Sequence, residues 1–429
     1  MRLSVVWFRN DLRICDNVTL RQAINNSDAI LPVYIFDSRK YRTSTYGFPK
    51  IGSFRAKFII ECVLDVRTNI RAAGGELYIR KGNPEDILKE LCLKYRAASV
   101  YFSKEAAPYE LKEEVAVRNA LEDVGVETYS FYNSTLLLRE KLPFTLSAMP
   151  DMFTAFRWSV ERTAIFGEPL SAPDFINVPK GLENEEIPSL QSLQLTEPRV
   201  DIRAAIQFAG GEKRAIQRIN EYVWQLEGPS TYFETRNQLV GANYSTKLSP
   251  WLAAGAISAR YVYNEIKRYE KERVANKSTY WIGFELLWRD FFRLNMEKYQ
   301  SELFFIKGPK RRDLSFRNDM NDLQIWIEGR TPNDFINANM NELRNTGYMS
   351  NRGRQVVASY LVHDLKINWL MGASYFESML IDYDVCSNYG NWAYIAGVGN
   401  DPRENRIFNV EKQAINYDRE GQYSRLWNQ

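Results

Sequence analysis

Apolar residues in the first third of the chain alternate between short β-rich runs and longer helical repeats. The predicted strands are 3–7, 29–36, 76–80, 98–102 and 127–131, and the predicted helices among them are 52–73, 84–95 and 108–124. In the first of these helices, Phe58, Cys62 and Val66 share one face, and two glycines end the repeat. Strands that alternate with helices indicate an α/β doubly wound domain with a mostly parallel sheet. The loop after the first strand lacks G-x-G-x-x-G, so we do not expect a dinucleotide there in the usual Rossmann manner.

The composition changes twice along the rest of the chain. Residues 135–200 carry clusters of Pro, Ser and Glu with weak periodicity, which predicts an inter-domain connector with one helix at 153–166. Helical spacing dominates after residue 200, and the predicted helices are 203–226, 249–273, 280–298, 320–328 and 333–345. We therefore predict an α/β domain at 1–134, a connector at 135–200 and a larger, all-α domain at 201–429.

The stretch 344–392 concentrates basic, aromatic and acidic residues along a predicted helix–turn–helix path. Apolar positions around Val357 and Leu361 indicate a first helix, and those around Phe376 indicate a second. Residues 382–391 are polar and contain Asp382-x-Asp384 followed by Ser-Asn-Tyr-Gly-Asn. We interpret them as a loop whose many donors and acceptors face a ligand. The alternative is an ordinary solvated loop.

Bulk composition narrows the function classes without choosing one. Aromatic residues make up 14% of the chain, and the net charge is only +3, so any nucleic-acid surface must be local. The four cysteines are scattered, and the single histidine, His363, lies beside Asp364, which argues against disulfide frameworks, zinc sites and histidine-pair chemistry. No signal peptide or apolar run of membrane-spanning length is evident. We therefore expect a soluble intracellular protein, cytoplasmic if bacterial.

Three local patterns are candidates for chemistry. Hydroxyls and a cation at 245–250 precede a predicted helix start, which suits a phosphate, although N-capping by Ser249 is the simpler reading. Glu285 lies in an apolar helix, where it either pairs with Arg289 or addresses a ligand. The basic run 307–312 is either a solvated surface or a phosphate contact.

At this point the sequence resembles the photolyase/cryptochrome flavoproteins, and within them the DASH cryptochromes. The motifs that carry the resemblance are WFRNDLRICDN, YGFPKIGSFRAKF, STKLSPWLAAGAIS, FELLWRDFFR, TGYMSNRGRQ and IDYDVCSNYGNWAYIAGVGNDPRENRIFN. The resemblance implies an antenna-type α/β domain and a helical domain that holds FAD. It also implies a deoxyribodipyrimidine photolyase, which repairs cyclobutane pyrimidine dimers, preferentially in single-stranded DNA, by electron transfer from excited reduced flavin. The alternatives are a blue-light photoreceptor without turnover, which the lack of a long tail after YDREGQYSRLWNQ disfavours, and a duplex photolyase.

The same resemblance assigns roles to individual residues. Those expected to contact FAD are Tyr232, Ser245, Thr246, Lys247, Leu248, Ser249, Arg289, Asp382, Asp384 and Asn388. The residues expected to act on the dimer are Glu285, Trp288, Asn351 and Asn388, and those expected to bind DNA are Arg236, Arg352, Gln355 and Tyr394. Trp392, Trp369 and Trp326 are the expected electron carriers. Glu105 is the expected contact of a methenyltetrahydrofolate antenna.

The sequence also departs from the family pattern in places. Phe316 stands where the third tryptophan is usual, so the final electron hop would need Trp326 or a tyrosine. The segment 329–343 lacks the usual Gly-Tyr/Phe-Pro turn, which leaves the local geometry of the flavin pocket open. Gln355 and Tyr394 are typical of the DASH branch and argue against a duplex enzyme. No histidine lies in 348–355, so the resemblance does not favour (6-4) photolyase activity.

Overall fold

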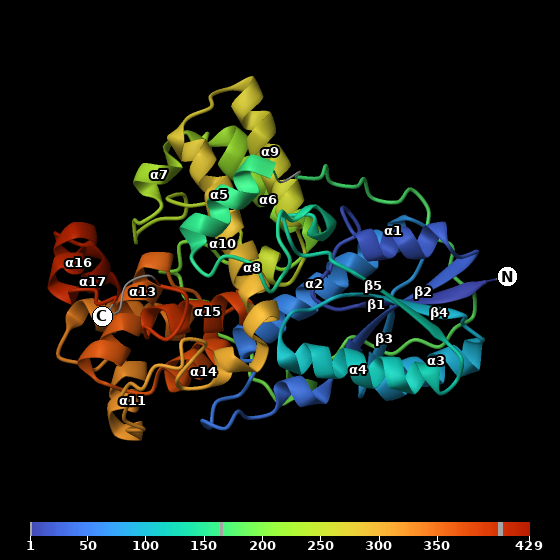
Figure 1. Cartoon of the computed structure of the whole chain (residues 1–429), viewed down its shortest axis with the longest axis horizontal. Coiled ribbons are helices and arrows are strands. Elements are labelled where there is room, and N and C mark those ends of the chain that lie inside the picture. The colour runs from blue at the N-terminus through green and yellow to red at the C-terminus, as the bar shows by residue number, and fades with distance from the viewer. Residues whose placement is uncertain (1, 164–165, 402–405) are drawn as a thin grey trace.

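A five-stranded parallel sheet forms the core of the amino-terminal half of the computed structural model, which describes residues 2–163, 166–401 and 406–429 (Figure 1). The strands are β1 (Leu3–Phe8), β2 (Ala29–Phe36), β3 (Tyr78–Lys81), β4 (Ser99–Ser103) and β5 (Glu127–Phe131), in the order β3-β2-β1-β4-β5. Every neighbouring pair is parallel. The predicted doubly wound fold is therefore confirmed.

Four helices wind around this sheet: α1 (Val18–Asn25), α2 (Ser53–Ala72), α3 (Pro84–Tyr95) and α4 (Pro108–Glu122). Both α3 and α4 begin at a proline, whose fixed φ suits the first helical turn. Helix α1 was not predicted, although Asn17 caps it by accepting a hydrogen bond from the Leu20 amide at 3.0 Å. An Asn before apolar residues is a signal for a helix start, and this signal was missed at Asn17.

The second half is helical and lies beside the sheet domain in Figure 1. Its helices are α5 (Phe153–Thr163), α6 (Glu212–Ile219), α7 (Tyr232–Thr235), α8 (Ser249–Ala253), α9 (Ala259–Glu272), α10 (Lys277–Tyr299), α11 (Met320–Ile327), α12 (Asp334–Thr346), α13 (Asn351–Ser359), α14 (Trp369–Met379), α15 (Val385–Ile395), α16 (Val410–Tyr417) and α17 (Gln422–Trp427). The long helix α10 packs against α5, α7, α9 and α15. None of the helices in the described part of the chain combines the length and apolarity needed to cross a bilayer.

Two helix predictions were wrong in their extent, and contacts with the sheet domain explain both. The predicted helix 203–226 begins only at Glu212, because the Gly211 amide is turned toward Cys62 and the Glu212 amide donates to Asp65 at 2.7 Å. The predicted helix 249–273 is split into α8 and α9 at Gly255, which has a φ of +67°. A Cβ at Gly255 would lie 1.9 Å from the Asn10 carbonyl oxygen, so only glycine permits this approach of the two halves.

The segment predicted as a connector contacts both halves at several points, although many of its residues are exposed. At its start, Asp290 of α10 accepts hydrogen bonds from the Leu136 and Leu137 amides at 3.1 and 2.7 Å. Helix α5 then packs on α10, and the chain returns to the sheet, where the Ile30 amide donates to the Asn177 carbonyl at 2.9 Å. Helix α5 ends at Thr163, residues 164–165 of the predicted helix 153–166 lie outside the described residues, and Phe166 forms an isolated bridge with Leu137. The boundaries at 134 and 200 stay a prediction.

Candidate functional site

A cavity of about 820 Å³ opens in the helical half, between segments that are far apart in the sequence. Most of the predicted site residues line it: Tyr232, Arg236, Thr246, Leu248, Ser249, Glu285, Trp288, Arg289, Asn351, Arg352, Gln355, Asp382, Asp384, Asn388, Trp392 and Tyr394. Ser245, Lys247, Trp326, Trp369 and Glu105 are not among its lining residues. The cavity has the size of ordinary cofactor sites.

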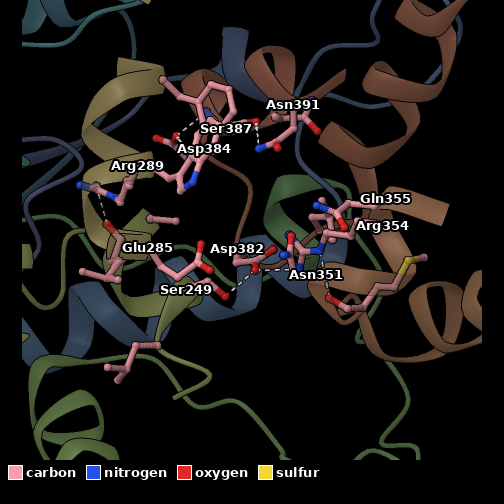
Figure 2. A pocket seen from close by; sticks show the side chains of 18 of the residues that line it. Ser249, Glu285, Arg289, Asn351, Arg354, Gln355, Asp382, Asp384, Ser387 and Asn391 are labelled. Carbon is pink, nitrogen blue, oxygen red and sulfur yellow. Dashed lines mark hydrogen bonds and ion pairs between the residues drawn. The ribbon is translucent and has the colours of Figure 1, made fainter. Parts of the chain in front are cut away.

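Asp382 is the main carboxylate of the cavity floor. Its Oδ2 accepts hydrogen bonds from the Ser249 hydroxyl at 2.6 Å and from Arg354 at 2.8 Å (Figure 2). Its Oδ1 is buried and has no hydrogen-bond partner. A buried acceptor without a partner is costly, so this atom points to a ligand that donates a hydrogen bond.

The contact with Ser249 tests one of the two interpretations of the segment 245–250, N-capping by Ser249, and the phosphate interpretation stays a prediction. Helix α8 begins at Ser249, with Leu248 as its N-cap and no side-chain cap. Ser249 therefore does not cap the helix, and that interpretation was wrong. Arg354, which pairs with Asp382, was missed because the arginine lies on α13 and the aspartate in the turn between α14 and α15, and only the fold joins them.

Residues 385–391 belong to helix α15, and only 382–384 form the turn before it, so the interpretation of 382–391 as a loop was wrong for most of its length. Asp384 caps α15 by accepting hydrogen bonds from the Ser387 amide at 2.8 Å and hydroxyl at 2.6 Å. Asn388 donates its amide nitrogen to the Ala373 carbonyl of α14 at 3.0 Å, which fixes the side chain at the cavity wall. Gly390 lies against the Phe292 ring of α10, where a Cβ would clash at 2.4 Å. Packing against α10 and α14 thus overrides the turn-like composition.

Glu285 lines the cavity and does not pair with Arg289. Its Oε1 accepts from Arg236 at 3.1 Å and from the Trp281 indole at 3.2 Å. Arg289 donates to the Ser134 and Leu252 carbonyls. Burial raises the pKa of Glu285, and the guanidinium of Arg236 and the indole of Trp281 oppose that shift.

Aromatic rings and cations complete the same wall. The Trp288 ring stacks on Phe153 of α5 with centroids 3.7 Å apart, and the edge of Tyr394 meets it at 5.9 Å. Arg406, which the sequence reading missed, donates to the Tyr394 hydroxyl at 3.0 Å. Arg352 donates to Asn237 at 3.2 Å. Both arginines line the cavity, and its polar wall is thus a mixture of cations and rings.

Lys247 does not line the cavity and is buried in a cluster of charged residues. Its ammonium stands 3.7 Å from the Tyr244 ring centroid and 4.9 Å from that of Tyr348. Burial lowers the pKa of Lys247 and raises that of the neighbouring Glu342, which accepts a hydrogen bond from the Tyr423 hydroxyl at 2.6 Å. The side chain of Lys247 therefore interacts with buried residues of the protein and not with the cavity.

The three predicted electron carriers are placed differently. Trp392 lines the cavity, and its ring centroid is 6.4 Å from that of Trp326 and 5.1 Å from that of Phe376. Trp369 is fully buried, and its ring lies 6.5 Å from Tyr389. Trp326 is also fully buried, so neither outer tryptophan reaches solvent.

Glu105 lies at the join of the two halves, away from the cavity. Its Oε2 pairs with Arg293 of α10 at 2.5 Å, and its Oε1 accepts from the Asn10 amide at 3.0 Å. Both carboxylate oxygens thus have protein partners. The basic run 307–312 is also engaged by the chain itself, because Arg312 donates to the Gly397 carbonyl at 3.0 Å and Arg311 pairs with Glu302 at 3.1 Å.

The cavity fits a large, flat ligand with ring N–H donors and with groups that bind cations. Oδ1 of Asp382 offers an unused acceptor, while the buried Nε atoms of Arg236 and Arg352 are donors without a hydrogen-bond partner. Aromatic rings flank these groups. FAD has this combination of a polar ring edge, a flat ring system and a diphosphate, so the residues present suit it.

Comparisons with known proteins agree with this geometry. The family model described as DNA photolyase matches residues 4–174, and the one described as FAD binding domain of DNA photolyase matches residues 281–428. The chain is 46% identical to cryptochrome DASH of Xenopus laevis over 430 residues, covering 99% of this chain and 82% of that protein. It is 44% identical to cryptochrome DASH of Gloeobacter violaceus, with 99% and 85% covered.

Solved structures show the same arrangement. The cryptochrome of Synechocystis sp. PCC6803 superimposes with a TM-score of 0.97 at 40% identity, covering 100% of this chain and 88% of that one. A bacterial class III photolyase from Agrobacterium tumefaciens superimposes with a TM-score of 0.86 at 26% identity, covering 100% and 86%.

Proposed function

Since the chain belongs to the photolyase/cryptochrome family, among its DASH cryptochromes, we propose that it is a light-driven repair enzyme for cyclobutane pyrimidine dimers, preferentially in single-stranded DNA. One observation carries the proposal. Glu285 and Trp288 lie on the same cavity as Asp382 and Asn388, so the expected substrate groups and the expected cofactor groups share one space.

In this proposal, FAD is held by the residues of the cavity floor and wall. Asp382 accepts a ring N–H donor through Oδ1, while Ser249 and Arg354 keep its other oxygen in place. Asn388 presents its amide from α15, since its nitrogen is anchored on Ala373. When bound, FAD supplies the absorption of blue light and a transferable electron, and the protein positions it.

The dimer enters on the side of Glu285 and Trp288. Trp288 offers an indole face on which an extruded base stacks, a contact that any base can make. Glu285, whose pKa is raised by burial, forms hydrogen bonds to the pyrimidine edge and stabilises the charge that develops when the dimer accepts an electron. Asn351 lies at the start of α13 on the same cavity and adds a further polar contact.

Gln355 and Tyr394 support the preference for single strands. Both line the cavity, and Arg406 holds the Tyr394 hydroxyl, so this part of the wall is polar. An extruded base binds less favourably against a polar wall than against an apolar wall. Extraction from a paired duplex is then harder, and prior unpairing helps. Arg236 and Arg352 are the proposed phosphate contacts.

Two features of the proposal lie outside the cavity. Trp392 is the first proposed electron carrier, and its contact with Trp326 supports a branch toward that ring as well as toward Trp369. The proposed contact of Glu105 with a methenyltetrahydrofolate antenna would add to its bonds with Asn10 and Arg293, since each carboxylate oxygen can accept a second hydrogen bond.

The test compares repair in two substrates. Purified, chemically reduced protein would be lit with blue light in the presence of one dimer-bearing oligonucleotide, either single-stranded or annealed. We expect thymines to be restored faster in the single strand. Unchanged dimer in the single strand, with flavin fully loaded, would instead support a photoreceptor, and equal rates would support a duplex photolyase.

A further inference from the structure

Phe153 forms the closest parallel ring contact of the cavity wall. Its ring lies 3.7 Å from that of Trp288 with an interplanar angle of 11°, so it covers one face of the indole. Phe153 is itself buried, with 6% of its surface exposed, and it does not line the cavity. Trp288 remains half-buried and lines the cavity with the surface that Phe153 leaves open.

Edge contacts fix Phe153 in this orientation. Phe284 meets its ring at 5.1 Å and 83°, and Phe291 meets it at 5.5 Å and 78°. Edge-to-face packing of this kind is favourable and directional. The ring of Phe153 therefore has a set plane, to which Trp288 lies parallel.

Helix α5, which carries Phe153, is held to α10 at both of its ends. Before the helix, Lys298 donates to the Met149 carbonyl at 2.8 Å and to Asp151 at 2.6 Å. Near the helix end, the Tyr280 hydroxyl donates to Glu161 at 2.6 Å. These contacts lie on either side of Phe153, so the position of its ring is determined by more than its own packing.

We propose that Phe153 is a positioning residue, which holds the Trp288 indole at the tilt that receives the flat face of an extruded pyrimidine dimer. The inference rests on the proposed function and deepens it, because it assigns a substrate-side role to the connector helix. Trp288 otherwise has mainly edge or tilted contacts, from Tyr394, Phe291 and Phe292. Without a parallel ring behind it, the indole has to be ordered when the substrate binds, and substrate affinity falls.

The test replaces the ring with an aliphatic side chain that still fills most of the space. Phe153→Leu and Phe153→Met remove the parallel plane, while Phe153→Tyr retains it. Phe156→Leu is the matched control, because Phe156 lies on the same helix, is fully buried and packs against Phe291 and Phe144, while its ring meets that of Phe153 only at 6.2 Å and 35°. For each variant, flavin content, thermal unfolding, the KM and kcat of repair, and binding of dimer-bearing and undamaged single strands in the dark would be measured.

We expect the Leu and Met variants to raise KM and the dark Kd for the dimer-bearing strand roughly three- to ten-fold. We also expect kcat and flavin content to change little and the Tyr variant to stay near the wild type. Phe156→Leu should lower the unfolding temperature without raising KM. An unchanged KM in both Phe153 variants, or an equal rise in Phe156→Leu, would overturn the proposal.

Failure of the proposed function has a different signature. If the wild type binds the dimer-bearing strand but does not repair it, the repair proposal fails. The dark binding of the Phe153 variants then still decides the role of the ring. Equal dark affinities of the wild type and both variants would be enough to contradict the positioning role of Phe153.

Discussion

Both halves of the molecule bury charged groups. Those at the sheet mostly pair with one another, whereas the helical cavity leaves several polar atoms without a hydrogen-bond partner. At the carboxyl end of the sheet, Arg9 pairs with Glu113 at 2.7 Å and with Glu114 at 2.5 Å, and Glu105 pairs with Arg293. Burial alone would lower the pKa of Arg9, but the surrounding carboxylates raise it. In the helical cavity, Oδ1 of Asp382 is buried without a hydrogen-bond partner.

This difference indicates where a ligand is needed. The crevice at the end of a doubly wound sheet is the usual ligand site of such folds. Here Arg9 and Arg293 are paired with carboxylates, although Oε2 of Glu110 is also buried without a hydrogen-bond partner. The helical cavity combines its unpartnered atoms with a space of about 820 Å³, so a buried polar atom without a partner indicates a binding site only where a cavity adjoins it.

The largest expected effect comes from removing the charge of Asp382. In Asp382→Asn, Arg354 loses its buried counter-charge and the cavity loses an acceptor. We expect the protein to purify without flavin, with an unfolding free energy lower by about 3 kcal/mol. Absorption spectra and urea unfolding measure both, and Asp313→Asn, at an exposed ion pair, is the control. Full flavin content in Asp382→Asn would show that the charge of Asp382 is not needed for flavin binding, and the proposed difference between the two halves would fail.

The sheet-side counterpart should cost stability but not flavin. Glu105→Gln removes one partner of the buried pair with Arg293, which we expect to lower the unfolding free energy by about 3 kcal/mol. Flavin content should be unchanged, because Glu105 does not line the cavity. Glu183→Gln, at an exposed pair with Lys94, should show no measurable change in unfolding. Loss of flavin in Glu105→Gln would contradict the separation of roles.

A pH series sharpens the comparison at the join between the halves. Burial raises the pKa of Asp290 to about 6 from 3.8, although the Leu137 and Leu136 amides oppose the shift. The folded state therefore holds the proton more tightly than the unfolded chain. The resulting stabilisation is complete below the unfolded pKa and is lost as pH rises through about 6, a change of about 3 kcal/mol.

The measurement is the unfolding free energy of the wild type and of Asp290→Asn at several pH values. The advantage of the wild type over the variant should shrink as pH rises from about 4 to about 7. Parallel curves for the two proteins would show that Asp290 does not titrate in this window.

A smaller effect, confined to catalysis, is expected at Glu285. We expect Glu285→Ala to repair the dimer about ten-fold more slowly or worse, because a group that stabilises developing charge is missing. Flavin content should remain intact, in contrast to Asp382→Asn. Glu302→Ala, on the surface beyond the carboxyl end of α10, is the control. Loss of flavin in Glu285→Ala would make Glu285 a structural residue.

The smallest effect is expected for a single phosphate contact. Arg352→Ala should weaken binding of single-stranded DNA a few-fold and reduce the salt slope of log K by about 0.7. Arg317→Ala, which removes an exposed arginine paired with Asp319 and Asp322, should leave the slope unchanged. Equal slopes for the wild type and Arg352→Ala would remove Arg352 from the DNA surface.

Local patterns in the sequence predicted most of the fold. The five strands and the helices that begin at Pro84 and Pro108 follow from apolar periods and from proline at the first turn. The failures came where the two halves touch or where packing overrides composition. Gly255 splits a helix to approach Asn10, and α15 is helical despite its turn-like residues.

The site was predicted less evenly than the fold. The family motifs indicated most of the residues that line the cavity, but their assigned roles stay predictions. Arg354, Arg406 and Phe153 were missed, because each contacts a partner from another part of the chain, which only the fold brings near. Lys247 was expected to contact the ligand, but it does not line the cavity and lies against the rings of Tyr244 and Tyr348, since sequence spacing does not determine which way a side chain turns.

Helix α10 carries Glu285 and Trp288 of the cavity wall, and a few residues further along it carries Asp290 and Arg293, which contact Leu136, Leu137 and Glu105. An exchange of the amino-terminal domain for that of a relative must therefore preserve these contacts, because a displaced α10 would move the cavity wall as well. The sheet domain and the shape of the cavity cannot be altered independently.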